Sequence, residues 1–434
     1  MLIPSSLLSS FVLTFLCAAP PAPQDPTPLL AGLRSADADE RAAAAQALER
    51  IGPAALRSLR ALRDETRDAD LKVRVEHVIG GIELSYPGGL MLAFCRGEAV
   101  RNELWLWRDG DTFALTANTT MEADVALSPD GRHVAFSRTP DHHDFGVHEL
   151  LVVELATGTT VMTDKSYAAR WSPDGTLLAI PRKDMLVLRR LDGSGERRVG
   201  ADLGEVREVQ WSPNGRFLAA ETKDGIAVLD AASGARHALV DGTPPDTSSL
   251  YNFSLGDSLV SMVCGNGPYE WDVYVAALDG EAARKLTTQS FRHGMTSLAP
   301  DASCLLSLQS APVRAGDGEG AGEADPGPRR PGHGGNGYAA YLLDIATGAQ
   351  REVFASANPL LQPQWSPEGR FVVFVDGAGM LQLLHVRSGR TRALTTMEVG
   401  YGPSTTSFAP SVWFANGRDL PEVKRPAIER PAAK

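Results

Sequence analysis

The stretch from Glu208 to Val240 reads EVQWSPNGRFLAAETKDGIAVLDAASGARHALV, and it decides the fold. Short runs in which apolar and polar residues alternate with a period of two indicate half-buried β-strands. Ser212–Gly215 has the composition of a tight turn, because proline presets φ while asparagine and glycine accept the left-handed conformation. A second hairpin turns at Ala232–Gly234. The stretch therefore predicts one four-stranded antiparallel sheet, with strands at Val209–Trp211, Arg216–Ala220, Ile226–Leu229 and Arg236–Val240.

The same pattern recurs along the chain when the copies are aligned on the proline of the turn. Full copies hold Pro87, Pro129, Pro173, Pro213, Pro300 and Pro367, a degenerate copy has Gly256 near the expected proline, and a truncated copy at Thr405–Phe414 holds Pro410. The period of about 42 residues is the size of a four-stranded propeller blade, and one such sheet cannot bury both faces without neighbours. We therefore predict an all-β propeller over residues 82–414, with seven blades favoured and eight or six as alternatives. The truncated copy would close the ring beside the first blade.

An aromatic residue ends the innermost strand of several copies. Trp171, Trp211 and Trp365 occupy this equivalent position. We expect them to wedge between adjacent blades as core residues, since a single ligand would not need the same aromatic repeatedly around the ring.

The repeated WSPDG, followed by an apolar strand and a hairpin with D-x-x-x-G, resembles the TolB-like, WD-repeat-like propeller family from Ile82 to about Phe414. The resemblance implies protein–protein contact with partners of the cell envelope. It implies no role for an individual residue, because the shared motif is structural.

The N-terminal part of the chain predicts a different structure. Residues 1–24, with an apolar run at Phe11–Leu16, are typical of a signal peptide or an N-terminal anchor. Residues 27–81 predict a small α-helical segment that resembles HEAT-like repeats in its Asp-rich turns and its Ile-Gly-Pro between helices. Its helices are expected at Asp39–Ile51, at Pro53–Arg67, and from Asp68 or Asp70 to a stop at Gly80-Gly81.

Two further segments and the composition narrow the class of protein. The Gly- and Pro-rich residues 315–338 predict a flexible insertion, and residues 415–434 a disordered tail. A formal net charge of −11 argues against a nucleic-acid-binding surface. Outside the leader there are three cysteines, Cys95, Cys264 and Cys304, so at least one of them is not in a disulfide within the chain. All three lie in apolar runs, and we expect them to be small residues of the core.

Few residues predict chemistry. Asp141, His142, His143, Asp144 and His148 gather on a loop between the second and third strands of their copy, and His142, His143, Asp144 and His148 are weak candidates for metal ligands. Their spacing matches no HExxH signature, so a solvated polar loop is the alternative. Asp130, Asp174, Asn214, Asp301 and Glu368 follow the turn proline, where we expect them to bind their own turn. No GxSxG, GxxxxGK[ST] or strand-linked GxGxxG motif predicts a catalytic or cofactor-binding residue, so no cofactor is expected.

These observations favour a non-catalytic binding or scaffold protein outside the cytoplasm, periplasmic or secreted, with protein partners of the envelope and membrane association through its N-terminus alone. An alternative is a propeller enzyme, a metal-dependent lactonase- or lyase-like hydrolase, with an axial site. For that, polar residues of the inner strands would have to converge, and these strands offer few: Asp124, Glu208, Gln210, Gln362 and Gln364. A sensor of a peptide or cell-wall ligand is a third hypothesis.

Overall fold

The structure of the chain is a computed structural model. It describes residues 25–87, 89–98, 101–108, 110–117, 121–139, 148–223, 225–241, 249–265, 271–278, 282–288, 290–291, 294–310, 337–396, 411–414 and 422–423. The chain divides into two compact units, Met1–Ile82 and Glu83–Lys434. The expected leader, residues 1–24, lies outside the described residues, as do most of the expected insertion and tail. No helix in the described part is long and apolar enough to cross a membrane.

The first unit is helical, as the sequence predicts. Its elements are α1 (Thr27–Gly32), α2 (Ala38–Ile51), the 3₁₀ helix η1 (Gly52–Ala55), α3 (Leu56–Glu65) and α4 (Ala69–Ser85). Asp37 caps α2, since its Oδ1 accepts hydrogen bonds from Asp39 N at 2.7 Å and Glu40 N at 3.1 Å. Asp68 caps α4 in the same way. Leu33, Leu48, Leu59, Val75 and Ile79 are among the buried residues of its core.

The predicted stop of the last helix at Gly80-Gly81 is wrong. Helix α4 continues through both glycines to Ser85. Glycine in a helix costs about 1 kcal/mol relative to alanine, and the burial of Ile79, Ile82 and Leu84 along this stretch contributes more than that.

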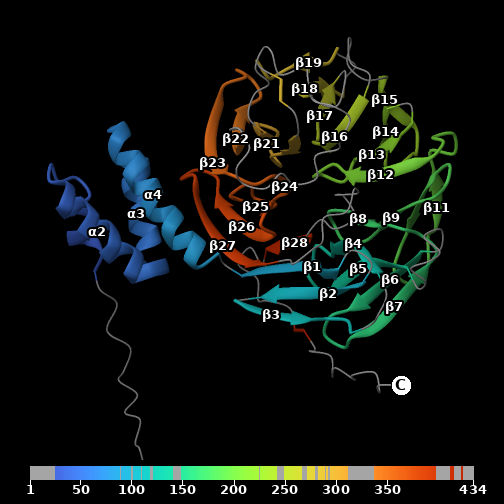
Figure 1. Ribbon diagram of the computed structural model, residues 1–434, viewed down its shortest axis with the longest axis horizontal. Coiled ribbons are helices and arrows are strands. Elements are labelled where there is room, and N and C mark those ends of the chain that lie inside the picture. The colour runs from blue at the N-terminus through green and yellow to red at the C-terminus, as the bar shows by residue number, and fades with distance from the viewer. Residues whose placement is uncertain are drawn as a thin grey trace, which may run out of the picture. The chain divides into compact units, whose positions relative to one another are not determined.

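The strands of the second unit form seven four-stranded antiparallel sheets, which we call blades 1 to 7. Figure 1 shows them arranged radially around a central axis. From the innermost strand outward, blade 1 is β28-β1-β2-β3, blade 2 β4–β7, blade 3 β8–β11, blade 4 β12–β15, blade 5 β16–β19, blade 6 β20–β23 and blade 7 β24–β27. The predicted all-β propeller with seven blades is confirmed.

The bounds of the strands are β1 Leu90–Glu98, β2 Arg101–Arg108, β3 Asp111–Ala114, β4 Met121–Leu127, β5 His133–Thr139, β6 Glu149–Glu154, β7 Thr159–Asp164, β8 Arg170–Trp171, β9 Leu178–Pro181, β10 Leu186–Arg189, β11 Arg197–Val199, β12 Val206–Trp211, β13 Phe217–Thr222, β14 Gly225–Asp230, β15 Arg236–Asp241, β16 Ser249–Leu255, β17 Leu259–Gly265, β18 Trp271–Ala277, β19 Arg284–Lys285, β20 Gly294–Leu298, β21 Cys304–Ser310, β22 Tyr338–Asp344, β23 Gln350–Ser356, β24 Leu360–Trp365, β25 Phe371–Asp376, β26 Met380–His385, β27 Arg390–Thr396 and β28 Ser411–Phe414. Blade 4 is the stretch on which the fold prediction rests. Its first turn is closed by Gly215 N donating to Ser212 O at 2.9 Å, with Gly215 at φ 73°.

The ring closes through the C-terminal strand. β28 pairs antiparallel with β1, Leu90 opposite Phe414 and Ala93 opposite Ser411. The first copy of the repeat begins with its second strand, so its blade lacks an innermost strand of its own. Residues 411–414 of the truncated copy form the innermost strand of blade 1, so this copy closes the ring beside the first blade as predicted. They cover the edge that β1 would otherwise expose.

The recurring tryptophans join neighbouring blades. Trp171 Nε1 donates to Ala126 O of blade 2 at 3.1 Å, and Trp211 Nε1 donates to Arg170 O of blade 3 at 3.1 Å. Trp365 Nε1 makes the equivalent bond to Ser297 O of blade 6 at 2.8 Å. The expectation that these residues wedge between blades as core residues is confirmed.

We predict that Trp171→Phe destabilises the protein by about 1 to 2 kcal/mol beyond the loss of packing, because it leaves a buried carbonyl without its donor. Trp107→Phe is the matched control, since Trp107 is also buried and no hydrogen bond of its indole is found in the described part. Denaturant midpoints measure both. Equal losses for the two variants would show that the indole bond contributes nothing.

All three described cysteines are free, with Cys95 and Cys264 buried and Cys304 partly buried. The expected core role is confirmed for Cys95 and Cys264.

Candidate functional site

The two ends of the ring differ in their connections. The turns between first and second strands and between third and fourth strands lie at one end, which we call the turn rim. The connections between second and third strands, and from one blade to the next, lie at the other end, the loop rim, because successive strands run antiparallel.

The acidic residues of the turn rim bind their own turns. Asp130 Oδ1 accepts from Ser128 Oγ at 2.5 Å and from Arg132 N at 3.0 Å, and Asp174 and Asn214 repeat this pattern in blades 3 and 4. Asp301 accepts from Ser303 N at 3.0 Å. Glu368 differs, because its longer side chain contacts the Arg370 guanidinium at 3.3 Å. The prediction of structural turn residues is thus confirmed for all but Glu368.

An ion pair joins the inner strands of blades 2 and 3. Asp124 lies at an irregular position of β4 with φ 52°, and Arg170 begins β8. Arg170 Nη2 and Asp124 Oδ1 are 3.6 Å apart, and their side chains are 26% and 13% exposed. Both groups are therefore mostly removed from water.

The Glu208 carboxylate acts on Asp124 and also on a further carboxylate, Glu221. Burial raises the pKa of Asp124 to about 7, the Arg170 guanidinium opposes the shift, and the Glu208 carboxylate adds to it. Burial, followed by the charge of Glu208, also raises the pKa of Glu221 to about 7, while Arg207 lowers it. Glu208 and Glu221 are opposite each other in the β12–β13 pair. We call Asp124, Arg170, Glu208 and Glu221 the axial cluster.

Tyr167 and His148 lie beside the axial cluster. Tyr167 Oη donates to Val206 O at 2.5 Å, and burial, reinforced by the Asp124 charge, raises the pKa of Tyr167 to about 12. The His148 ring is 6.4 Å from the Tyr167 ring, and its Nδ1 is 3.2 Å from Thr139 Oγ1.

The predicted metal ligands are only partly visible. Of the four candidates the structure describes His148, while His142, His143 and Asp144 lie outside the described residues. Among the described residues, no group of three His, Cys, Asp or Glu side chains is arranged to hold a metal ion. The metal site therefore stays a prediction.

Other polar residues of the inner strands form hydrogen bonds between neighbouring blades. Gln210 donates through Nε2 to Phe253 O at 3.0 Å and accepts from Leu255 N at 3.2 Å, which joins blade 4 to blade 5. Asn252 Oδ1 accepts from Thr296 N at 2.9 Å and joins blade 5 to blade 6. Gln362 N lies 3.3 Å from Met295 Sδ, whereas the Gln364 side chain is exposed. Gln210 Nε2 also donates to Glu208 Oε1 at 3.0 Å, so three of the five polar residues proposed for an axial catalytic site, Asp124, Glu208 and Gln210, lie together.

Sequence reasoning missed Arg170, Glu221 and Tyr167. Arg170 could have been found, since it stands immediately before the tryptophan of WSP, where Gln210 and Gln364 stand in their copies. Glu221 is the one charged residue in the run FLAAET, which is otherwise typical of a buried strand. No local signal predicted that Arg170 would pair with Asp124 or that Glu221 would lie opposite Glu208.

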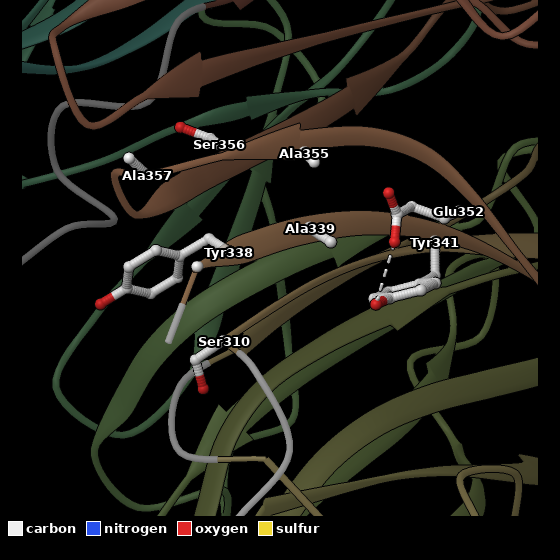
Figure 2. A pocket seen from close by; sticks show the side chains of 9 residues that line it. Ser310, Tyr338, Ala339, Tyr341, Glu352, Ala355, Ser356 and Ala357 are labelled. Atoms are coloured by element: carbon white, nitrogen blue, oxygen red, sulfur yellow. Dashed lines mark hydrogen bonds between the residues drawn. The ribbon is translucent and has the colours of Figure 1, made fainter. Parts of the chain in front are cut away.

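A cavity of about 440 Å³ lies on blade 6 and is drawn in Figure 2. Its lining is mostly small residues, and Glu352 is its one charged residue, with Tyr341 Oη 3.4 Å from the Glu352 carboxylate. Among the described residues that line it, none is a histidine or lysine that could activate Ser310 or Ser356.

Comparison with known proteins supports the repeat. A family model of the WD40 domain of anaphase-promoting complex subunit 4 matches residues 169–244, which span blade 3 and blade 4. This match and the seven four-stranded blades confirm the WD-repeat-like resemblance. No curated protein matches the sequence.

Several solved structures are similar to the chain. TolB from Acinetobacter baumannii is 14% identical with a TM-score of 0.43, covering 79% of this chain and 70% of TolB. Kuenenia stuttgartiensis hydrazine synthase is 13% identical with a TM-score of 0.42, covering 60% of this chain and 76% of that one. A chain of the mitotic checkpoint complex is 12% identical with a TM-score of 0.46, covering 68% of this chain and 83% of that one.

The raised pKa of Asp124 predicts a pH dependence of stability. The folded chain keeps the Asp124 proton up to about pH 7, whereas an unfolded aspartate loses it near pH 4. The stability that this proton gives the folded chain is therefore full below pH 4, and it is lost as the pH rises towards 7. The unfolding free energy of the unchanged protein should therefore fall between pH 5 and pH 8. In Asp124→Asn, this fall should be smaller by about 2 to 3 kcal/mol. Asp184→Asn, at an exposed aspartate, is the control. The same pH dependence in all three proteins would contradict the raised pKa of the buried Asp124 carboxyl.

Proposed function

We propose that the chain is a non-catalytic binding protein that acts outside the cytoplasm and holds a protein partner with a basic surface on its loop rim. The axial cluster carries this proposal. Asp124 pairs with Arg170, Glu208 acts on Asp124, and Glu221 lies opposite Glu208, so the acidic groups of the cluster outnumber its one cation. Such a surface favours a partner of opposite potential.

The rest of the ring fits a binding platform. Inner-strand side chains hold the blades together and give rigid support, while the connections of the loop rim can vary without cost to the core. The turn rim offers less free charge, since its Asp and Asn side chains bind their own turns. The apolar run at Phe11–Leu16 is the feature that supports export and an envelope partner.

The test is affinity capture from envelope extracts with a charge-reversed rim. Glu208→Lys places a cation inside the axial cluster, and Glu196→Lys makes the same change at an exposed position of the turn rim. We expect Glu208→Lys to capture at least tenfold less of the partner than the unchanged protein, and Glu196→Lys to capture as much. Capture by the unchanged protein should weaken as the salt concentration is raised. Equal capture by both variants would overturn the proposal.

The raised pKa values favour a second candidate, an axial enzyme. A carboxyl that titrates near pH 7 suits general acid–base chemistry. Metal analysis of the purified protein distinguishes the two: stoichiometric metal that is lost in Glu208→Gln but retained in Glu196→Gln would favour the metal-dependent enzyme.

A further inference from the structure

The junction between blades 7 and 1 is where the chain enters and leaves the ring. Inner-strand hydrogen bonds join the other neighbours, for example Ser411 Oγ accepting from Leu127 N at 2.8 Å between blades 1 and 2. In the described part, no such bond joins β24 to β28. The closing junction instead buries one apolar cluster: Leu90, Leu92, Phe94 and Trp107 of blade 1, Phe371, Val373, Val375, Leu381 and Leu383 of blade 7, and Leu84.

Leu84 comes from the last turn of α4, and this turn is bound to blade 7. Arg392 Nη1 donates to Leu84 O at 2.8 Å and to Ser85 O at 3.3 Å, so a cation of β27 caps the C-terminus of the helix. Glu83, 3% exposed, lies with its Oε2 3.2 Å from His385 Nε2 and 3.5 Å from Arg370 Nη1. Removing one partner of a buried ion pair is costly, because it leaves the remaining charge buried without compensation.

His385 stands where other blades have the aspartate of the outer hairpin. Asp230 accepts from Ser233 N and Oγ, and Asp344 from Thr347 N and Oγ1. His385 Nδ1 takes the same role with Ser388 N at 3.3 Å and Ser388 Oγ at 2.8 Å. Because a backbone N–H can only donate, Nδ1 is the acceptor and the ring hydrogen is on Nε2, the atom 3.2 Å from Glu83 Oε2. An aspartate here would cap the turn equally well but would repel Glu83.

We propose that the last turn of α4, residues 83–85, is a latch that holds the ring closed at the junction of blades 7 and 1. Helix α4 begins in the first unit and ends in the second, so an event that unwinds its end releases the latch. Release opens this junction while blades 3 to 5, which have their own inner-strand bonds, stay folded. The latch is a conformational device, independent of the proposed binding function.

Hydrogen exchange of the full chain, read by mass spectrometry, tests the latch. Arg392→Ala removes the cap and leaves the hairpin intact, whereas His385→Asp keeps the hairpin acceptor but places a second carboxylate beside Glu83 in place of the imidazole. We expect exchange in β28 and β1 to rise about tenfold in both variants, with β12–β18 unchanged. Because Arg392 is exposed, its variant remains informative if His385→Asp fails to fold.

Arg197→Ala is the matched control, since Arg197 also lies on an outer strand and donates to the carbonyls of Ala231 and Ala232 in the next blade. It should leave β28 and β1 as protected as in the unchanged protein. Unchanged exchange in β28 and β1 of Arg392→Ala, or an equal rise in every blade, would overturn the latch.

Discussion

Deleting residues 411–434 is expected to unfold the propeller. The deletion removes β28, so the inner edge of β1 loses its partner and its backbone groups lie open at the centre of the ring. Leu127 N of blade 2 loses the Ser411 hydroxyl as well. The loss should exceed about 5 kcal/mol, which is comparable to the whole stability of many domains. Circular dichroism on heating should show no cooperative transition, and size-exclusion chromatography should show aggregation.

Deletion of residues 424–434 is the control, because it keeps β28 and the described residues 422–423. It should melt like the full chain. Cooperative melting of the larger deletion at the temperature of the smaller one would show that β28 does not close the ring.

Glu122→Ala is expected to cost about 3 to 5 kcal/mol. Glu122 is 0% exposed and joins β4 of blade 2 to blade 1. Its Oε2 accepts from Leu104 N at 2.7 Å and from Thr116 Oγ1 at 2.6 Å, so both donors are left without this acceptor when the carboxylate is removed. Denaturant unfolding with a common slope measures the loss.

Two variants separate this effect from general damage. Glu122→Gln keeps an oxygen acceptor and should lose less than half as much. Glu149→Ala breaks the partly exposed Arg138–Glu149 ion pair and should cost less than about 1 kcal/mol. If Glu122→Ala loses no more unfolding free energy than Glu149→Ala, the buried Glu122 carboxylate does not stabilise the fold in the way we describe.

The fold was predictable because its signals are local. The turn at Ser212–Gly215 and the alternation around it depend on neighbouring residues, and repetition with a period of about 42 residues implies the ring. The end of α4 was not predictable, because Arg392 and His385, which hold it, are about 300 residues away in sequence. The position of β28 as the innermost strand of blade 1 was not predictable either, because it depends on pairing with the free edge of β1, which is far away in the sequence.

The site was less predictable than the fold. Asp124 and Glu208 were recognised as polar inner-strand residues, but the sequence could not show that Arg170 of the intervening blade pairs with Asp124. Their electrostatic coupling arises from the ring, which brings residues some 40 positions apart together at the axis. The role of His385 could have been suspected, since HVRSG replaces the aspartate of LDAASG and LDIATG.

The central claim is that the loop rim is the binding face. Hydrogen exchange of the chain alone and in complex with its captured partner tests it most directly. The account predicts protection at the starts of β4, β8 and β12 and at Tyr167. Protection confined to the turn rim, at Ser128–Gly131 and Ser212–Gly215, would contradict it.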